Sequence, residues 1–141
     1  MSASIGRTLT LSRVPVSIDA GLLILRVWIG FSLFLKHGLE KLTRYSQMAA
    51  YFPDPIHIGS HAGLIFALVC DAICSILIIL GFATRLAALL IVINLAVAFA
   101  LVHRFGMFGP HNGELAFLYF GAALVLVITG GGRFSIDHLL R

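Results

Sequence analysis

Charged residues are scarce in this sequence. Asp, Glu, Lys and Arg together make up 11% of its 141 residues, whereas soluble domains contain about 25%. Hydrophobic residues reach 60%, and the mean hydropathy is +1.03. This composition excludes an ordinary water-soluble domain, and it excludes intrinsic disorder, which needs few apolar residues and many charges. We therefore predict one membrane-embedded domain over residues 1–141.

Cysteine is equally rare, and familiar cofactor motifs are missing. The two cysteines, Cys70 and Cys74, lie inside one apolar run, so the sequence has no disulfide framework. A buried cysteine usually acts as a small hydrophobic side chain. Walker, Rossmann, serine-hydrolase and covalent haem-attachment motifs are absent, and the spacing of the histidines and cysteines predicts no metal site.

Four runs are long and apolar enough to cross the ~30 Å hydrocarbon core as helices. They cover residues of about 20–42, 63–81, 84–103 and 113–130. Polar and apolar residues do not alternate in these runs, which excludes the strands of a membrane barrel. Because the connections are short, neighbouring helices are expected to run in opposite directions. The sequence thus predicts an all-α membrane protein with an antiparallel four-transmembrane-helix bundle.

Basic residues near the ends of the runs predict the orientation. One side of the membrane would carry five of them and the other side three. The five are Arg7, Arg13, Arg85, Arg133 and Arg141, and the three are Lys41, Arg44 and Arg104. This excess places both termini in the cytoplasm, with residues 1–19 as a cytoplasmic N-terminal segment. Since the basic residues are scattered singly, we expect no nucleic-acid partner.

Polar side chains inside the runs need an explanation, because an ionisable residue in a span costs about 2.5–3.5 kcal/mol. Helical spacing places one small or polar set on a single face of the first run: Arg26, Gly30, Leu33, His37 and Glu40. Asp71 and Asn94 lie near the middle of the second and third runs. We predict a buried Arg26–Asp71 ion pair, which would either be purely structural or line a pocket.

A second polar cluster is predicted at the outer end of the bundle, where the ends of three runs meet. These ends carry His37, Glu40, His103, His111 and Glu114, and a nearby loop carries His57 and His61. Histidine and carboxylate side chains can transfer protons, bind a quinone carbonyl or ligate metal. Alternatively, they are polar residues at the membrane interface, with Glu114 favourably placed in a first helical turn. The candidate pocket residues are Arg26, His37, Glu40, Asp71, Asn94, His103 and Glu114.

Several stretches, in order and over about residues 22–137, resemble the DoxX family. They are Leu25-Arg26 with Gly30 and 37–42, Asp71 with Cys74-Ser75 and Leu80-Gly81, the turn 81–88, Gly113-Glu114-Leu115-Ala116 with Tyr119, and 129–137. Asp71 stands where the family usually has glutamate. The resemblance implies a four-helix integral protein of the bacterial inner, or cytoplasmic, membrane.

The resemblance also suggests a function. The family takes its name from a subunit of an archaeal thiosulfate:quinone oxidoreductase, and other members are associated with redox and stress functions. We therefore expect a membrane subunit of a quinone-linked redox system, with a polar pocket for a quinone or small molecule. In the lipid bilayer it would bind a protein partner or a second copy of itself. A non-catalytic membrane anchor or assembly factor is the alternative, and a small transporter is a third.

Overall fold

The structure, a computed structural model, describes residues 17–141. Most of the predicted cytoplasmic segment 1–19 lies outside the described residues. Within them, all regular secondary structure is helical. Four segments are long and apolar enough to cross a membrane: Ile18–Thr43, Ser60–Leu80, Thr84–Val102 and Gly109–Thr129. The predicted all-α membrane fold and its four spans are therefore confirmed.

Three of the spans combine α-helix with a π-helical turn. The first contains α2 (Ile18–Leu33), η1 (Phe34–Gly38) and α3 (Leu39–Thr43). The second contains α5 (Ser60–Leu68), η2 (Val69–Cys74) and α6 (Ser75–Leu80). The third contains α7 (Thr84–Val97) and η3 (Ala98–Val102). The fourth consists of the 3₁₀ turn η4 (Gly109–His111) and α8 (Glu114–Thr129), and two short helices lie outside the spans, α4 (Tyr45–Met48) and α9 (Ile136–Leu139).

The first and second spans pack side by side, with their contacts in reverse chain order. Arg26 near the start of the first span lies against Ile78 and Ile79 near the end of the second. Further along the first span, Gly38 lies against Asp71. A Cβ on Gly38 would lie 2.5 Å from the Asp71 carbonyl oxygen, so only glycine permits this close approach.

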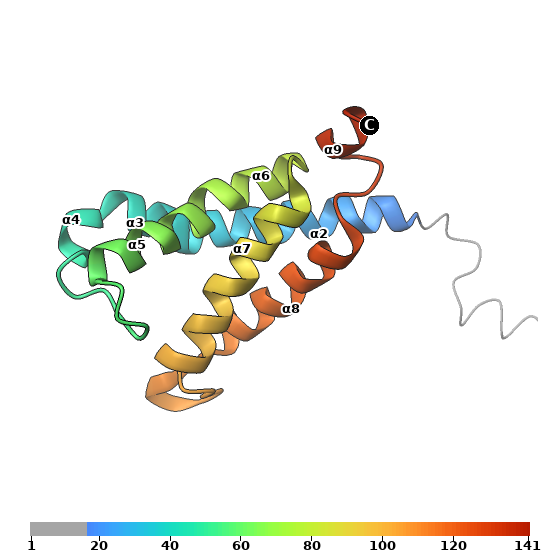
Figure 1. The fold of residues 1–141 in the computed structure, drawn as a ribbon. Coiled ribbons are helices and arrows are strands. Elements are labelled where there is room, and N and C mark those ends of the chain that lie inside the picture. Colours follow the sequence, from blue (N-terminus) through green and yellow to red (C-terminus); the bar gives the residue numbers. More distant parts are fainter. Residues whose placement is uncertain (1–16) are drawn as a thin grey trace, which may run out of the picture.

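The third and fourth spans form a second pair. Arg85 at the start of α7 donates a hydrogen bond to Ile128 O near the end of α8. At the opposite end of this pair, the His103 side chain lies against Gly113. Figure 1 shows that the two pairs meet near the turn between α6 and α7 and diverge toward α4 and η4.

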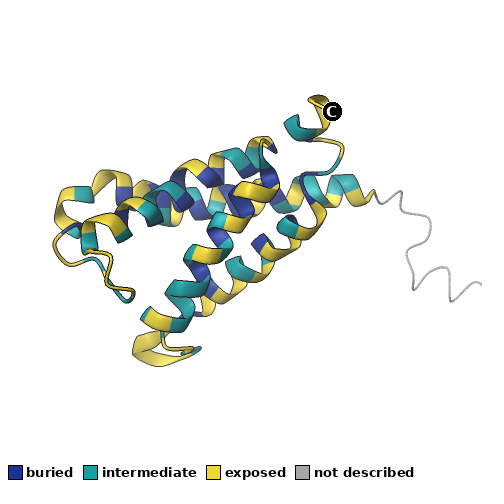
Figure 2. Cartoon of the chain, viewed as in Figure 1, coloured by how far each residue is buried: buried dark blue, intermediate teal, exposed yellow. Residues whose placement is uncertain are grey.

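Buried residues follow the contact lines between the helices, and the outer faces are exposed (Figure 2). Many of the exposed residues are large and hydrophobic. The core consists mainly of small and aliphatic side chains such as Leu64, Ile78, Ala88 and Leu126, all fully buried. Trp28 on the outer face of α2 is 75% exposed. In a soluble protein such an apolar surface would aggregate, whereas in a bilayer it contacts lipid.

Candidate functional site

Asp71 is the centre of a buried polar cluster formed by three spans. Its carboxylate accepts a hydrogen bond from Lys41 Nζ at 2.7 Å and one from Asn94 Nδ2 at 3.2 Å. Lys41 is 8% exposed and Asp71 is 4% exposed. Buried charges are stable only when they are paired and hydrogen-bonded, and this cluster meets both conditions.

The predicted Arg26–Asp71 ion pair is wrong, because Lys41 occupies that position. The Arg26 guanidinium is fully buried and instead donates to three backbone carbonyls, of Ile78, Ile79 and Phe134. The first two lie at the end of α6, where helix carbonyls lack partners within their own helix. Asp71 packs at the level of Gly38, twelve residues or about 18 Å further along the first span, which is beyond the reach of Arg26.

The π turn η1 explains why Lys41, and not Glu40, faces inward. The Leu39 N–H donates to Phe34 O, five residues back, which inserts one extra residue relative to an α-helix. Residues after the turn are therefore one position out of register with the α-helical pattern before it. Residue 41 takes the inward position that the regular pattern gives to residue 40. Lys41 is buried, whereas Glu40 is exposed and forms only a loose 3.7 Å contact with Arg44.

The three π turns found within residues 17–141 all lie around this cluster. Asp71 lies within η2, His37 lies within η1, and Asn94 lies four residues before η3 begins. Single π turns inside α-helices often occur at functional sites, because they reorient side chains at a cost in helix regularity. Their position in three neighbouring spans indicates that this part of the molecule is built around the polar cluster.

A cavity of about 240 Å³ opens beside the cluster. Its polar lining comes from all four spans and from the loop before α8: His37, Lys41, Asp71, Asn94, His103, Asn112 and Tyr119. Four of the predicted pocket residues, namely His37, Asp71, Asn94 and His103, thus line one cavity. The cavity combines one ion pair with imidazole, amide and phenol groups, a lining that can bind a carbonyl compound and exchange protons with it.

Tyr119 is a cavity residue that was noted only within the family pattern. Its hydroxyl is 2.5 Å from the hydroxyl of Ser32. The His37 ring meets the Tyr119 ring edge to face, with centroids 6.1 Å apart. These contacts connect the first and fourth spans across the cavity and fix the orientation of both rings. Lys41 was also missed, because its position suggested a flanking charge that sets the orientation in the membrane.

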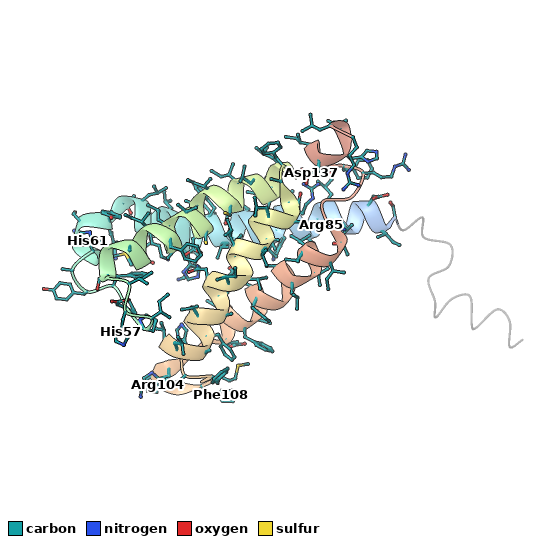
Figure 3. The ribbon with its side chains drawn as sticks, in the orientation of Figure 1. His57, His61, Arg85, Arg104, Phe108 and Asp137 are labelled. Carbon is teal, nitrogen blue, oxygen red and sulfur yellow. The ribbon has the colours of Figure 1, made fainter. Side chains whose placement is uncertain are left out.

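The remaining predicted residues lie elsewhere. Arg26 is at the opposite end of the first span, and Glu40 and Glu114 are exposed and do not line the cavity. His57 and His61 are also exposed, and Figure 3 shows them on the connection before α5 and at its start. Within residues 17–141, no three His, Cys, Asp or Glu side chains are arranged to hold a metal ion.

The two cysteines are buried in the core and unpaired. Cys70 Sγ donates to Leu90 O at 3.4 Å. Neither cysteine lines the cavity beside Asp71. Their packing agrees with the role of small hydrophobic side chains.

An apolar groove of about 430 Å³ adjoins the polar cavity. It lies between the connection around residues 52–58 and the outer part of α7 and η3, and it shares Phe52, Asn94 and Ala98 with the cavity. The elements that line the groove lie on the side where the two helix pairs diverge (Figure 1). A polar cavity that continues into an apolar groove can accept a molecule with a polar head and an apolar tail.

Comparisons with known proteins agree with this architecture. The family model described as DoxX matches residues 21–104. Two relatives from Haemophilus influenzae (strain ATCC 51907 / DSM 11121 / KW20 / Rd), both described as uncharacterized proteins, match over 126 residues each. One is 32% identical and covers 83% of this chain and 88% of its own length. The other is 30% identical and covers 85% and 83%. No solved structure matches.

Proposed function

We propose that this chain, which belongs to the DoxX family, is a membrane subunit of a quinone-linked redox system. The observation that carries the proposal is the Lys41–Asp71–Asn94 cluster beside a cavity that continues into an apolar groove. Ionisable residues within a membrane are expensive and usually serve a function. A quinone has the matching shape, since its head carries two carbonyl groups and its tail is apolar.

The cavity residues have distinct roles in this proposal. The Asn94 amide and the Lys41 ammonium are donors that could bind a carbonyl oxygen, while Asp71 holds both in place. His37 and Tyr119 lie across the cavity, and histidine can supply or remove a proton near neutral pH. Quinone reduction takes up two electrons and two protons. The residues supply only protons, so the electrons would come from a cofactor on a partner protein.

Direct binding tests the proposal. The protein would be purified in mild detergent, titrated with a short-chain quinone and measured by calorimetry, and its own co-purified lipids would be analysed by mass spectrometry. Asn94→Leu removes one donor at nearly constant volume and should weaken binding by about tenfold, as expected for one hydrogen bond of ~1 kcal/mol plus a buried group left unpaired. His103→Ala should also weaken binding, whereas His61→Ala, on an exposed histidine outside the cavity, should not.

Two results would contradict the proposal. The first is the absence of both a co-purified quinone and measurable quinone binding. The second is equal binding by wild-type protein, Asn94→Leu and His103→Ala. If a stable protein partner co-purified without any quinone, the alternative function would be favoured: a non-catalytic anchor or assembly factor, which needs no carrier of its own.

We also propose that the protein lies in the cytoplasmic membrane with both termini in the cytoplasm. The support is the distribution of basic residues, since Arg85, Arg133 and Arg141 lie at the end of the molecule that holds the C-terminus. Cytoplasmic ends of membrane proteins are enriched in Lys and Arg. A C-terminal green fluorescent protein fusion should fluoresce and a C-terminal alkaline phosphatase fusion should be inactive; the reverse result would overturn this orientation.

A further inference from the structure

A second polar cavity lies at the end of the molecule where α7 begins and the chain after α8 returns. It has a volume of about 430 Å³, and Arg85, Arg133, Arg141 and His138 are among its lining residues. Figure 3 shows Arg85 and Asp137 at this end and Arg104 at the opposite end. The proposed quinone site uses none of these residues, so this cavity requires a separate explanation.

Hydrogen bonds fix the wall of this cavity. The Asp137 carboxylate accepts from the backbone N–H groups of Ala83 at 2.7 Å and Thr84 at 2.8 Å, which caps the start of α7. The Arg26 guanidinium donates to Phe134 O and so ties the C-terminal segment to the first and second spans. These contacts hold the C-terminal segment against the start of α7.

Cationic donors are in excess in this cavity. Its two carboxylates are already engaged, because Asp137 caps α7 and Asp19 accepts from the Arg133 backbone N–H at 2.8 Å. Arg85 uses one N–H group on Ile128 O. Within residues 17–141, the guanidinium groups of Arg133 and Arg141 form no hydrogen bond or ion pair. The cavity thus holds three arginines against two aspartates, and its unbonded guanidinium groups can donate to an anion.

The Thr84 side chain belongs to the wall of the cavity. It is fully buried, and its backbone N–H and side chain both interact with the Asp137 carboxylate. The side chains that a ligand can reach are the exposed Arg85, Arg133 and Arg141.

Exposed apolar side chains flank the cavity. Phe134, Leu139 and Leu140 are 58%, 81% and 70% exposed, respectively. Basic residues next to exposed aromatic and aliphatic side chains are typical of segments that lie on an anionic membrane surface. Guanidinium groups bind phosphate oxygens in a bidentate geometry.

We propose that this cavity binds the phosphate headgroup of an anionic phospholipid, with Arg85, Arg133 and Arg141 around the phosphate. The acyl chains lie beside Phe134 and the outer faces of the helices. The bound lipid fixes the C-terminal segment at the membrane surface.

The test uses the full chain in a neutral detergent and titrates it with fluorescent phosphatidylglycerol. The double variant Arg133→Gln/Arg141→Gln should bind about 25-fold more weakly, which is about fivefold for each arginine near an anionic headgroup. The matched control Lys36→Gln/Arg104→Gln removes the same charge from residues outside the cavity and should change the affinity by less than about twofold.

Competition distinguishes the sources of the phosphate. Inorganic phosphate and glycerol phosphate at millimolar concentration should not displace the lipid. If either one displaced it and bound alone, the site would recognise a soluble anion and the lipid proposal would be overturned. An equal loss of affinity in the arginine double variant and its control would also overturn it, because general electrostatic attraction would then account for the binding.

Discussion

Breaking the Lys41–Asp71 pair from one side should be far more damaging than removing both partners. The pair is 2.7 Å long, and its side chains are 10% and 5% exposed. Asp71→Asn keeps the side-chain volume but leaves the Lys41 ammonium without a counter-ion in a membrane-spanning segment. Removal of one member of a buried pair typically costs about 3–5 kcal/mol, so Asp71→Asn and Lys41→Met should each lower the free energy of unfolding by about that amount.

The double variant distinguishes pairing from simple packing. Replacement of both members of a buried pair is often neutral, so Lys41→Met/Asp71→Asn should be within about 1–2 kcal/mol of wild type. The free energy of unfolding would be measured by denaturant titration in mixed micelles, with helical circular dichroism as the signal. Glu40→Gln is the matched control: its contact with Arg44 is 3.7 Å long and well exposed, and such pairs contribute about 0–1 kcal/mol.

A companion set of variants tests the assignment of partners directly. Suppose that Arg26 were the true partner of Asp71. Adding Arg26→Met to the Asp71→Asn variant would then restore its free energy of unfolding, whereas adding Lys41→Met would not. We expect the opposite, because Arg26 is bonded to backbone carbonyls and not to Asp71. Rescue by Arg26→Met, or destabilisation in the Lys41→Met/Asp71→Asn double variant equal to the sum of the single variants, would refute this description of the site.

Three further predictions follow from single contacts. Gly38→Ala should destabilise the protein by at least about 2 kcal/mol, because the new Cβ would lie 2.5 Å from the Asp71 carbonyl oxygen and strain the tightly packed core. The control is Gly21→Ala, whose new Cβ would have no atom within 4 Å. In thermal unfolding it should be neutral or stabilising by up to about 1 kcal/mol. Arg26→Met should lower the melting temperature markedly, since it leaves three carbonyls without their donor; an unchanged melting temperature would contradict this. Burial alone raises the pKa of Asp137, but hydrogen bonds from the Thr84 side chain and from the backbone N–H groups of Thr84 and Ala83 outweigh it, so the pKa lies below its usual value. The difference in stability between wild type and Asp137→Asn should therefore be fully present above about pH 4, the ordinary pKa of an aspartate. It should disappear as the pH falls through the lowered pKa. A difference that stayed constant down to about pH 2 would refute this prediction.

The sequence was sufficient to predict the spans but not the partners of the buried charges. Span boundaries depend on the length and hydropathy of each run, and the predicted 84–103 corresponds to an observed Thr84–Val102. Pairing between helices depends on their axial offset, which hydropathy does not contain. Asp71 at the centre of its span therefore seemed to belong opposite Arg26, whereas the close contact at Gly38 places it 12 residues away.

Helix periodicity predicts the buried face of the first span correctly only up to Leu33, where the regular α-helix ends. Arg26 and Leu33 are both buried as the stripe requires. The π turn from Phe34 to Gly38 then shifts the pattern by one residue, so Lys41 replaces Glu40 on the inner face. A π turn has no distinctive composition, and a sequence pattern cannot reveal it. The same irregularity that defeats prediction creates the ion pair.

The two buried cations of the first span have different surroundings, and these indicate different roles. Arg26 is fully buried and bonded to three carbonyls that would otherwise lack donors, so its contacts are those of a structural residue. Lys41 pairs with an acid on the wall of a cavity, beside a histidine and a tyrosine. Stability alone does not require such a pair, because apolar side chains of similar volume would serve equally well. Three interrupted helices maintain it, which supports binding and proton transfer as the function of this cavity.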